Sequence, residues 1–72
     1  MSFNSEAYLK AQVRRCENDL ARIPQGEDKM RAMLKLAYKW LGEALSKPYS
    51  KTRQIEILDH CAWIVVYEKK LS

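Results

Sequence analysis

The sequence predicts an all-α protein: a compact three-helix bundle, or a helical hairpin plus a third helix, that forms an oligomer through its third helix. The 72 residues contain two glycines and two prolines, too few for an architecture of strands and tight turns. Both prolines lie in short turn-forming stretches, which divide the single domain into three segments. Within each segment, apolar residues recur at steps of three and four, the period of a helix with one buried side.

The first helix is predicted over about residues 5–23. Its apolar stripe consists of Leu9, Val13, Cys16, Leu20 and Ile23. Asn4 or Ser5 can cap the start, and Pro24 ends the helix. Because this stripe is narrow, the helix needs only one neighbour.

The second helix is predicted over about residues 27–46, and Pro48 ends it. Glu27 and Asp28 fall in the first turn, where the helix dipole favours acids. The apolar stripe consists of Met30, Leu34, Ala37, Leu41 and Ala44. Met33, Leu36, Trp40 and Leu45 widen this stripe, and we expect Trp40 in the core.

The third helix is predicted over about residues 51–71, with Ser50 as its N-cap. One stripe consists of Ile55, Leu58, Ala62 and Val65, and a second of Ile57, Cys61, Ile64 and Leu71. A helix that is apolar almost all round is either central or shared between subunits. Because no helix of a three-helix unit is surrounded by other helices, we expect the third helix to be shared between subunits. The candidate interface residues are Trp40, Ile57, Cys61, Trp63, Ile64, Tyr67 and Leu71.

Composition favours a cytoplasmic protein. Two cysteines are too few for a disulfide-rich scaffold and lack the paired spacing of a zinc site, although one bridge between them stays open. No basic stretch followed by an apolar one opens the chain, so no secretory signal is expected. The longest apolar run, residues 61–67, is far shorter than the roughly 20 residues that cross a bilayer.

Positive charge is concentrated in residues 29–53, where Glu43 is the single acid among seven basic residues. This asymmetry favours an anionic partner, which could be a nucleic acid, a nucleotide-like small molecule or an acidic protein surface. The basic residues are Lys29, Arg31, Lys35, Lys39, Lys47, Lys51 and Arg53. The candidate anion-binding residues are Arg31, Lys35, Lys39, Lys47, Ser50, Lys51, Thr52 and Arg53.

Each of these groups also has a simpler interpretation as a solvated surface. Arg31, Lys35 and Lys39 step by four along the second helix and form a basic row that resembles an ordinary exposed helix face. The loop segment of residues 46–53 lacks the glycine-rich cradle of a phosphate site. A helix-turn-helix interpretation places the helix from residue 51 in a DNA groove. Glu56 and Asp59 argue against that interpretation, because they repel phosphates.

No catalytic or metal site is expected. Glu56 and His60 share a helix face, but two ligands do not make a zinc site. Asp59, His60 and Cys61 are consecutive, so on a helix their side chains point about 100° apart and cannot converge. We therefore expect neither an enzyme nor a cofactor.

The sequence favours a small non-enzymatic interaction protein that acts as an adaptor, inhibitor or regulator through protein–protein contacts. The alternative is the binder of anionic ligands described above. Compact, basic, cysteine-poor helical chains of this size are often accessory proteins of phages or mobile elements, although no motif here supports that association. We expect a homo-oligomer with a protein partner and no membrane association.

Overall fold

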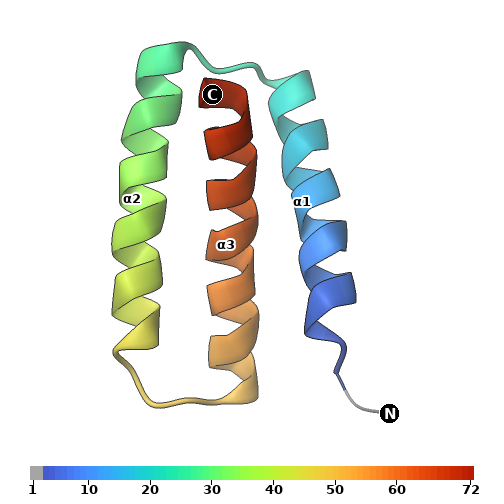
Figure 1. Ribbon diagram of the computed structural model, residues 1–72, viewed down its shortest axis with the longest axis vertical. Helices are drawn as coiled ribbons and strands as arrows, with labels where there is room; N and C mark the ends of the chain where they lie inside the picture. Colours follow the sequence, from blue (N-terminus) through green and yellow to red (C-terminus); the bar gives the residue numbers. More distant parts are fainter. Residues whose placement is uncertain (1–2) are drawn as a thin grey trace.

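The computed structural model describes residues 3–72, which form three α-helices (Figure 1). Helix α1 spans Ser5–Arg22, α2 spans Glu27–Leu45 and α3 spans Lys51–Leu71. The predicted all-α three-helix bundle is confirmed. The first two helices each end one residue earlier than expected, and the third has the expected bounds.

Local capping explains where the helices begin. The Asn4 side chain accepts a hydrogen bond from the N–H of Ala7 at 3.1 Å and caps α1. The Ser50 hydroxyl accepts a hydrogen bond from the N–H of Arg53 at 3.0 Å and caps α3. Each contact satisfies a first-turn donor that has no partner within the helix.

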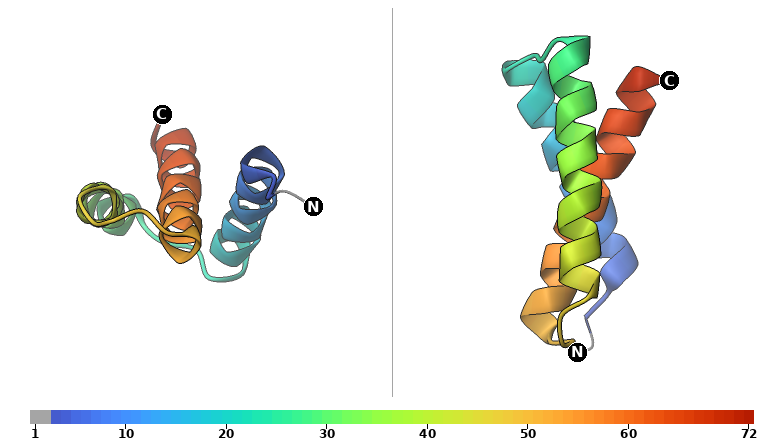
Figure 2. Two further views of the ribbon diagram at one scale, coloured as in Figure 1. Left: turned by 90° about the horizontal axis from the view of Figure 1, so that it is seen from below. Right: turned by 90° about the vertical axis from the view of Figure 1, so that its left-hand side faces the viewer.

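Helix α3 lies between the other two helices (Figures 1 and 2). Both α1 and α2 pack against α3, whereas the backbones of α1 and α2 do not come close to each other. The expectation that the first helix needs one neighbour is therefore confirmed. The reasoning that no helix of a three-helix unit is surrounded did not consider that one helix can have a neighbour on each side, as α3 does. Much of its broad apolar surface is thus used within the chain.

The main core lies toward the end of the bundle where α1 leads into α2. Its buried members are Cys16, Leu20, Ala62, Val66 and Tyr67. Leu9, Val13, Met30, Met33, Leu34 and Trp63 pack against them and are partly buried. Val66 is the largest side chain that is fully buried. The core is therefore small, and large apolar side chains stay at the surface.

Trp40 is one of these surface side chains, with 41% of its area exposed. The expectation that Trp40 lies in the core is wrong. The physical reason is the open arrangement: no third helix covers this part of the α2–α3 pair, because α1 lies on the far side of α3.

Candidate functional site

An aromatic hollow of about 270 Å³ lies between α2 and α3. It is lined by Gln25, Met33, Ala37, Trp40, His60, Trp63 and Tyr67. Except for Gln25, which precedes α2, these residues come from the two packed helices. A concave, mostly apolar surface with a few polar groups is typical of a binding site.

Two short rows of side chains build the hollow. On α2 the row is Met33, Ala37 and Trp40, and on α3 it is His60, Trp63 and Tyr67. In each row the residues step by three and four, which places them on one side of their helix. Ala37 is buried and small, so the space between the larger side chains of its row stays open.

The rings are held by contacts within the hollow. The Trp63 and Tyr67 rings stack with their centroids 5.3 Å apart, and the Trp40 and His60 rings lie 6.0 Å apart. The Tyr67 hydroxyl donates a long hydrogen bond of 3.4 Å to the Gln25 side-chain oxygen. Tyr67 is 2% exposed and closes the inner side, whereas Trp40 stands at the surface. The hollow therefore has a fixed inner wall and an exposed edge.

Charged groups near the hollow are paired with each other. Arg53 forms an ion pair with Glu56 at 2.6 Å, and the Nε2 atom of His60 lies 3.8 Å from the same carboxylate. The Nε atom of Arg53 is covered and has no hydrogen-bond partner. His60 thus has both a carboxylate and an aromatic ring as neighbours, and no lysine, arginine, aspartate or glutamate is among the residues that line the hollow.

Asp59 points away from the hollow, toward α1. Its Oδ1 atom accepts hydrogen bonds from the Tyr8 hydroxyl and the Gln12 amide, both at 2.8 Å. Burial raises the pKa of Tyr8, and the hydrogen bond to Asp59 raises it further. Asp59 therefore faces α1 while His60 faces Trp40 of α2, so the consecutive acid, histidine and cysteine do not converge.

The candidate interface residues lie at different depths. Ile64 and Tyr67 are buried within the chain. Ile57, Cys61, Trp63 and Leu71 are partly covered, and Trp40 is exposed. Trp40, Trp63 and Tyr67 come together in the hollow. The aromatic content and the steps of three and four were visible in the sequence, but the pairing of the two rows was not.

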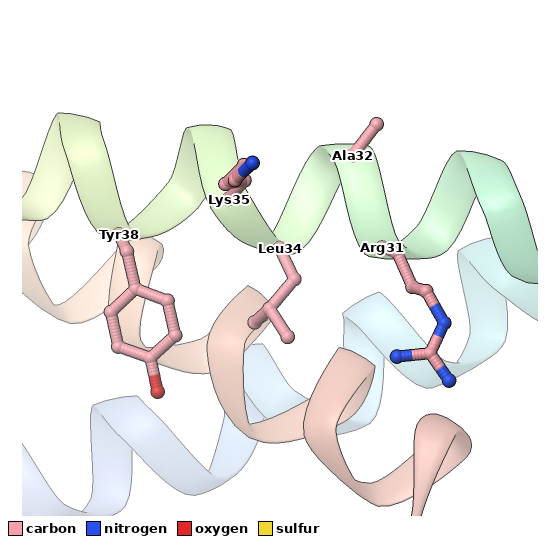
Figure 3. A pocket seen from close by; sticks show the side chains of 5 residues that line it. All are labelled: Arg31, Ala32, Leu34, Lys35 and Tyr38. Carbon is pink, nitrogen blue, oxygen red and sulfur yellow. The ribbon is translucent and has the colours of Figure 1, made fainter.

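The basic row on α2 remains exposed. Arg31 and Lys35 line a shallow surface depression with Ala32, Leu34 and Tyr38 (Figure 3), and Lys39 is exposed one turn further along. The figure shows Leu34 pointing toward α3 and Ala32 pointing away. Arg31 is paired with Glu27 at 3.3 Å, and the Tyr38 hydroxyl donates to Glu68. Two of the polar groups at this depression thus already have protein partners.

The remaining anion-binding candidates lie at the other end of α2. Ser50 is used as the cap of α3, and Arg53 is paired with Glu56. Lys47, Lys51 and Thr52 are exposed. With a rise of 1.5 Å per residue, the length of α2 separates this group from Arg31 by roughly 20 Å. The structure therefore does not gather the eight residues into one site.

Both cysteines are free thiols. Burial is the main cause that raises the pKa of Cys16 to about 11, and the nearby carboxylate of Asp19 adds to it. Burial also raises the pKa of Cys61. Raised pKa values keep both groups protonated at neutral pH, the unreactive form of the side chain.

Comparison with known protein families, with characterised proteins and with solved structures finds no match to this chain. Within residues 3–72, no group of three acidic, histidine or cysteine side chains is placed to hold a metal ion. None of the helices in the same residues combines the length and the apolar character that a membrane crossing requires.

Proposed function

We propose that the protein is a small, non-enzymatic helical interaction protein, and that it contacts another protein chain through the aromatic hollow between α2 and α3. The observation that carries this proposal is the lining of the hollow: Trp40, Trp63 and Tyr67 surround a space of about 270 Å³. Tryptophan and tyrosine are enriched among the residues that dominate binding energy at protein interfaces.

The chemistry of the lining supports an apolar occupant. A space of this size accepts one large side chain, and it lies below the range of about 300–1,000 Å³ that is usual for drug-sized ligands. Around that space, the Gln25 amide and the His60 ring can form hydrogen bonds at the edge of a contact. An aliphatic or aromatic side chain with a polar surrounding is the occupant that fits this combination.

Binding of an anionic ligand is the alternative, and its support is weaker. Lys35 and Lys39 are exposed on α2, but Arg31 is already paired with Glu27 and Ser50 already caps α3. The basic row on α2 and the basic segment that follows this helix also form separate groups, and roughly 20 Å lie between Arg31 and the second group. Binding of a nucleic acid along both groups stays a separate prediction, and a strong dependence of the affinity on salt would be its signature.

Photo-crosslinking from the surface of α2 tests the proposed function. Leu36 lies one turn from Trp40 on the same side of the helix, whereas Leu45 lies about two and a half turns from Leu36 and so on the opposite side. Both side chains are exposed. A photoreactive residue at position 36 should form adducts with a protein chain in a native extract, and the same group at position 45 should not.

The identity of the adduct decides the outcome. An adduct between position 36 and any protein chain supports the proposal, whether that chain is a different protein or a second copy. Adducts that disappear after nuclease treatment, or equal yields from positions 36 and 45, contradict it.

A further inference from the structure

We infer that the chain in the hollow is a second copy of this protein, so that the protein forms a two-fold dimer through the faces that carry Leu36 and Trp40. This inference rests on the proposed function and names its partner. Three features of the described residues support it: the exposed area, the shape of the face and the distribution of charge.

The exposed area exceeds that of a closed domain. The chain exposes 5385 Å², whereas a compact monomer of 8.5 kDa exposes about 4,650 Å². The excess of roughly 700 Å² is close to the area of about 800 Å² that each partner buries in a standard interface. The radius of gyration of 12.8 Å also exceeds the value of about 11 Å expected for this length. One copy therefore leaves open about as much surface as one dimer contact covers.

The face around the hollow is suited to pair with itself. In a two-fold interface the same patch is used on both copies, so a protruding group and the depression that receives it must lie on one surface. Leu36 and Trp40 form an exposed ridge, 38% and 41% exposed, and Trp40 also lines the hollow. The ridge of each copy can therefore enter the hollow of the other.

The charges around the face are mixed, although the protein carries a net charge of +4. Beside the hollow, Glu56 is paired with Arg53. A second depression shares Gln25 and Trp63 with the hollow, and there Asp19 is paired with Arg22 at 2.9 Å. On α2, exposed residues of both signs border Leu36 and Trp40: Lys29, Lys39 and Glu43. A two-fold pairing therefore has to place the Glu43 carboxylate of each copy near a lysine of the other, which avoids like-charge repulsion across the contact.

Sedimentation equilibrium of the purified full chain tests the inference. The wild-type protein should be a dimer at micromolar concentration. The substitution Leu36→Lys should give a monomer, because it places an additional positive charge on both sides of the contact. Leu45→Lys, which adds the same charge on the opposite side of α2, should leave the dimer intact. Circular dichroism should show the same helix content for all three proteins, since both leucines are exposed.

A second variant gives the expected magnitude. Trp40→Ala removes the same anchor from both copies, and truncation of such an anchor costs about 2 kcal/mol or more. The two truncations together should weaken the dissociation constant on the order of a thousandfold. Trp40 contacts His60, so urea denaturation should first show that this variant still folds. The Leu36→Lys variant tests the dimer without removing that contact.

The outcomes separate this inference from the proposed function. A wild-type monomer at high micromolar concentration overturns the dimer, and so does a dimer that Leu45→Lys breaks while Leu36→Lys does not. If the purified protein is a monomer but position 36 still crosslinks to a different protein in the extract, the proposed function stands and only the identity of the partner is wrong.

Discussion

The two sides of α3 are held in different ways. Toward α1, polar contacts span the half of the interface nearest the start of α3: Asp59 accepts from Tyr8 and Gln12, and Gln54 donates to the Ser5 hydroxyl at 2.8 Å. Toward α2, the contacts around the hollow are mainly aromatic and aliphatic, and they leave a concave surface.

This difference shows on which side of α3 the packing is satisfied within the chain. Hydrogen bonds between specific atoms fix the register of α1 on α3, and the groups involved have found their partners within the chain. Aromatic packing around a space is satisfied only when that space is filled. The α1 side is therefore mainly structural, and the α2 side is where we expect another chain to contribute.

The largest expected effect concerns Tyr67, the buried inner wall of the hollow. Tyr67→Ala should lower the free energy of unfolding by about 3–5 kcal/mol, because it removes a large buried ring. Tyr67→Phe should change it by less than about 0.5 kcal/mol, since the hydrogen bond to Gln25 is long at 3.4 Å. Urea denaturation measures both. A large loss for Tyr67→Phe would show that the α2 side depends on hydrogen bonding after all.

The next effect concerns Asp59 on the α1 side. Asp59→Ala should cost about 1–3 kcal/mol, because the Tyr8 hydroxyl and the Gln12 amide both lose their acceptor in a partly buried place. Asp59→Asn keeps an acceptor oxygen and should cost less. The midpoints of urea denaturation rank the three proteins. If Asp59→Ala leaves the midpoint unchanged, polar contacts do not hold α1 in place.

A smaller effect is expected at the helix caps. Ser50→Ala should lower the free energy of unfolding by about 1 kcal/mol, because α3 loses its N-cap and is packed against both other helices. Asn4→Ala removes the corresponding cap of α1 at the start of the described chain, where fraying is confined to one turn. Thermal denaturation followed by circular dichroism should therefore show the larger shift for Ser50→Ala. Equal shifts would contradict the central role of α3.

The last effect, which appears only at alkaline pH, is a pH dependence at Cys16. The folded state raises the pKa of its thiol from 9.0 to about 11, chiefly through burial. The contribution of Cys16 to stability is thus complete below pH 9 and falls as the pH rises toward 11, because the unfolded chain ionises first. The stability difference between the wild type and Cys16→Ala should therefore shrink over this range, as measured by urea denaturation. If the stability difference stays constant over this pH range, the Cys16 thiol is not shielded from solvent by α3.

The helices could be predicted from the sequence because their limits are local. Pro24 and Pro48 stop helices wherever the rest of the chain lies, and Ser50 caps α3 through a contact three residues away. The observed bounds accordingly agree with the expected ones to within one residue.

The arrangement of the helices was harder to predict because it depends on which stripes meet. The two stripes of α3 could equally serve two neighbours in one chain or one neighbour in each of two chains, and periodicity does not distinguish these cases. The expected burial of Trp40 failed for the same reason, since it depended on whether α1 covers α2. The hollow depends both on which stripe of α3 meets α2 and on whether α1 covers that side of α2. Its outline could therefore not be derived from residue spacing alone.

The position of α1 has a consequence for the order of folding. Helices α2 and α3 are joined by residues 46–50 and form a hairpin from contacts that are near in sequence. The hydrogen bond between Tyr8 and Asp59, by contrast, joins residues 51 positions apart. Closing that long loop costs more conformational entropy and is slower. We expect the hairpin to form first and α1 to dock onto it last.

The same order applies in reverse when the native protein opens. Helix α1 can detach from α3 without separating α2 from α3, because its backbone does not approach α2. Its amide hydrogens should then exchange with solvent faster than those in the middle of α3. Each such opening uncovers Ala62 and Val66, which are fully buried otherwise, so the first helix acts as a detachable cover over the centre of the molecule.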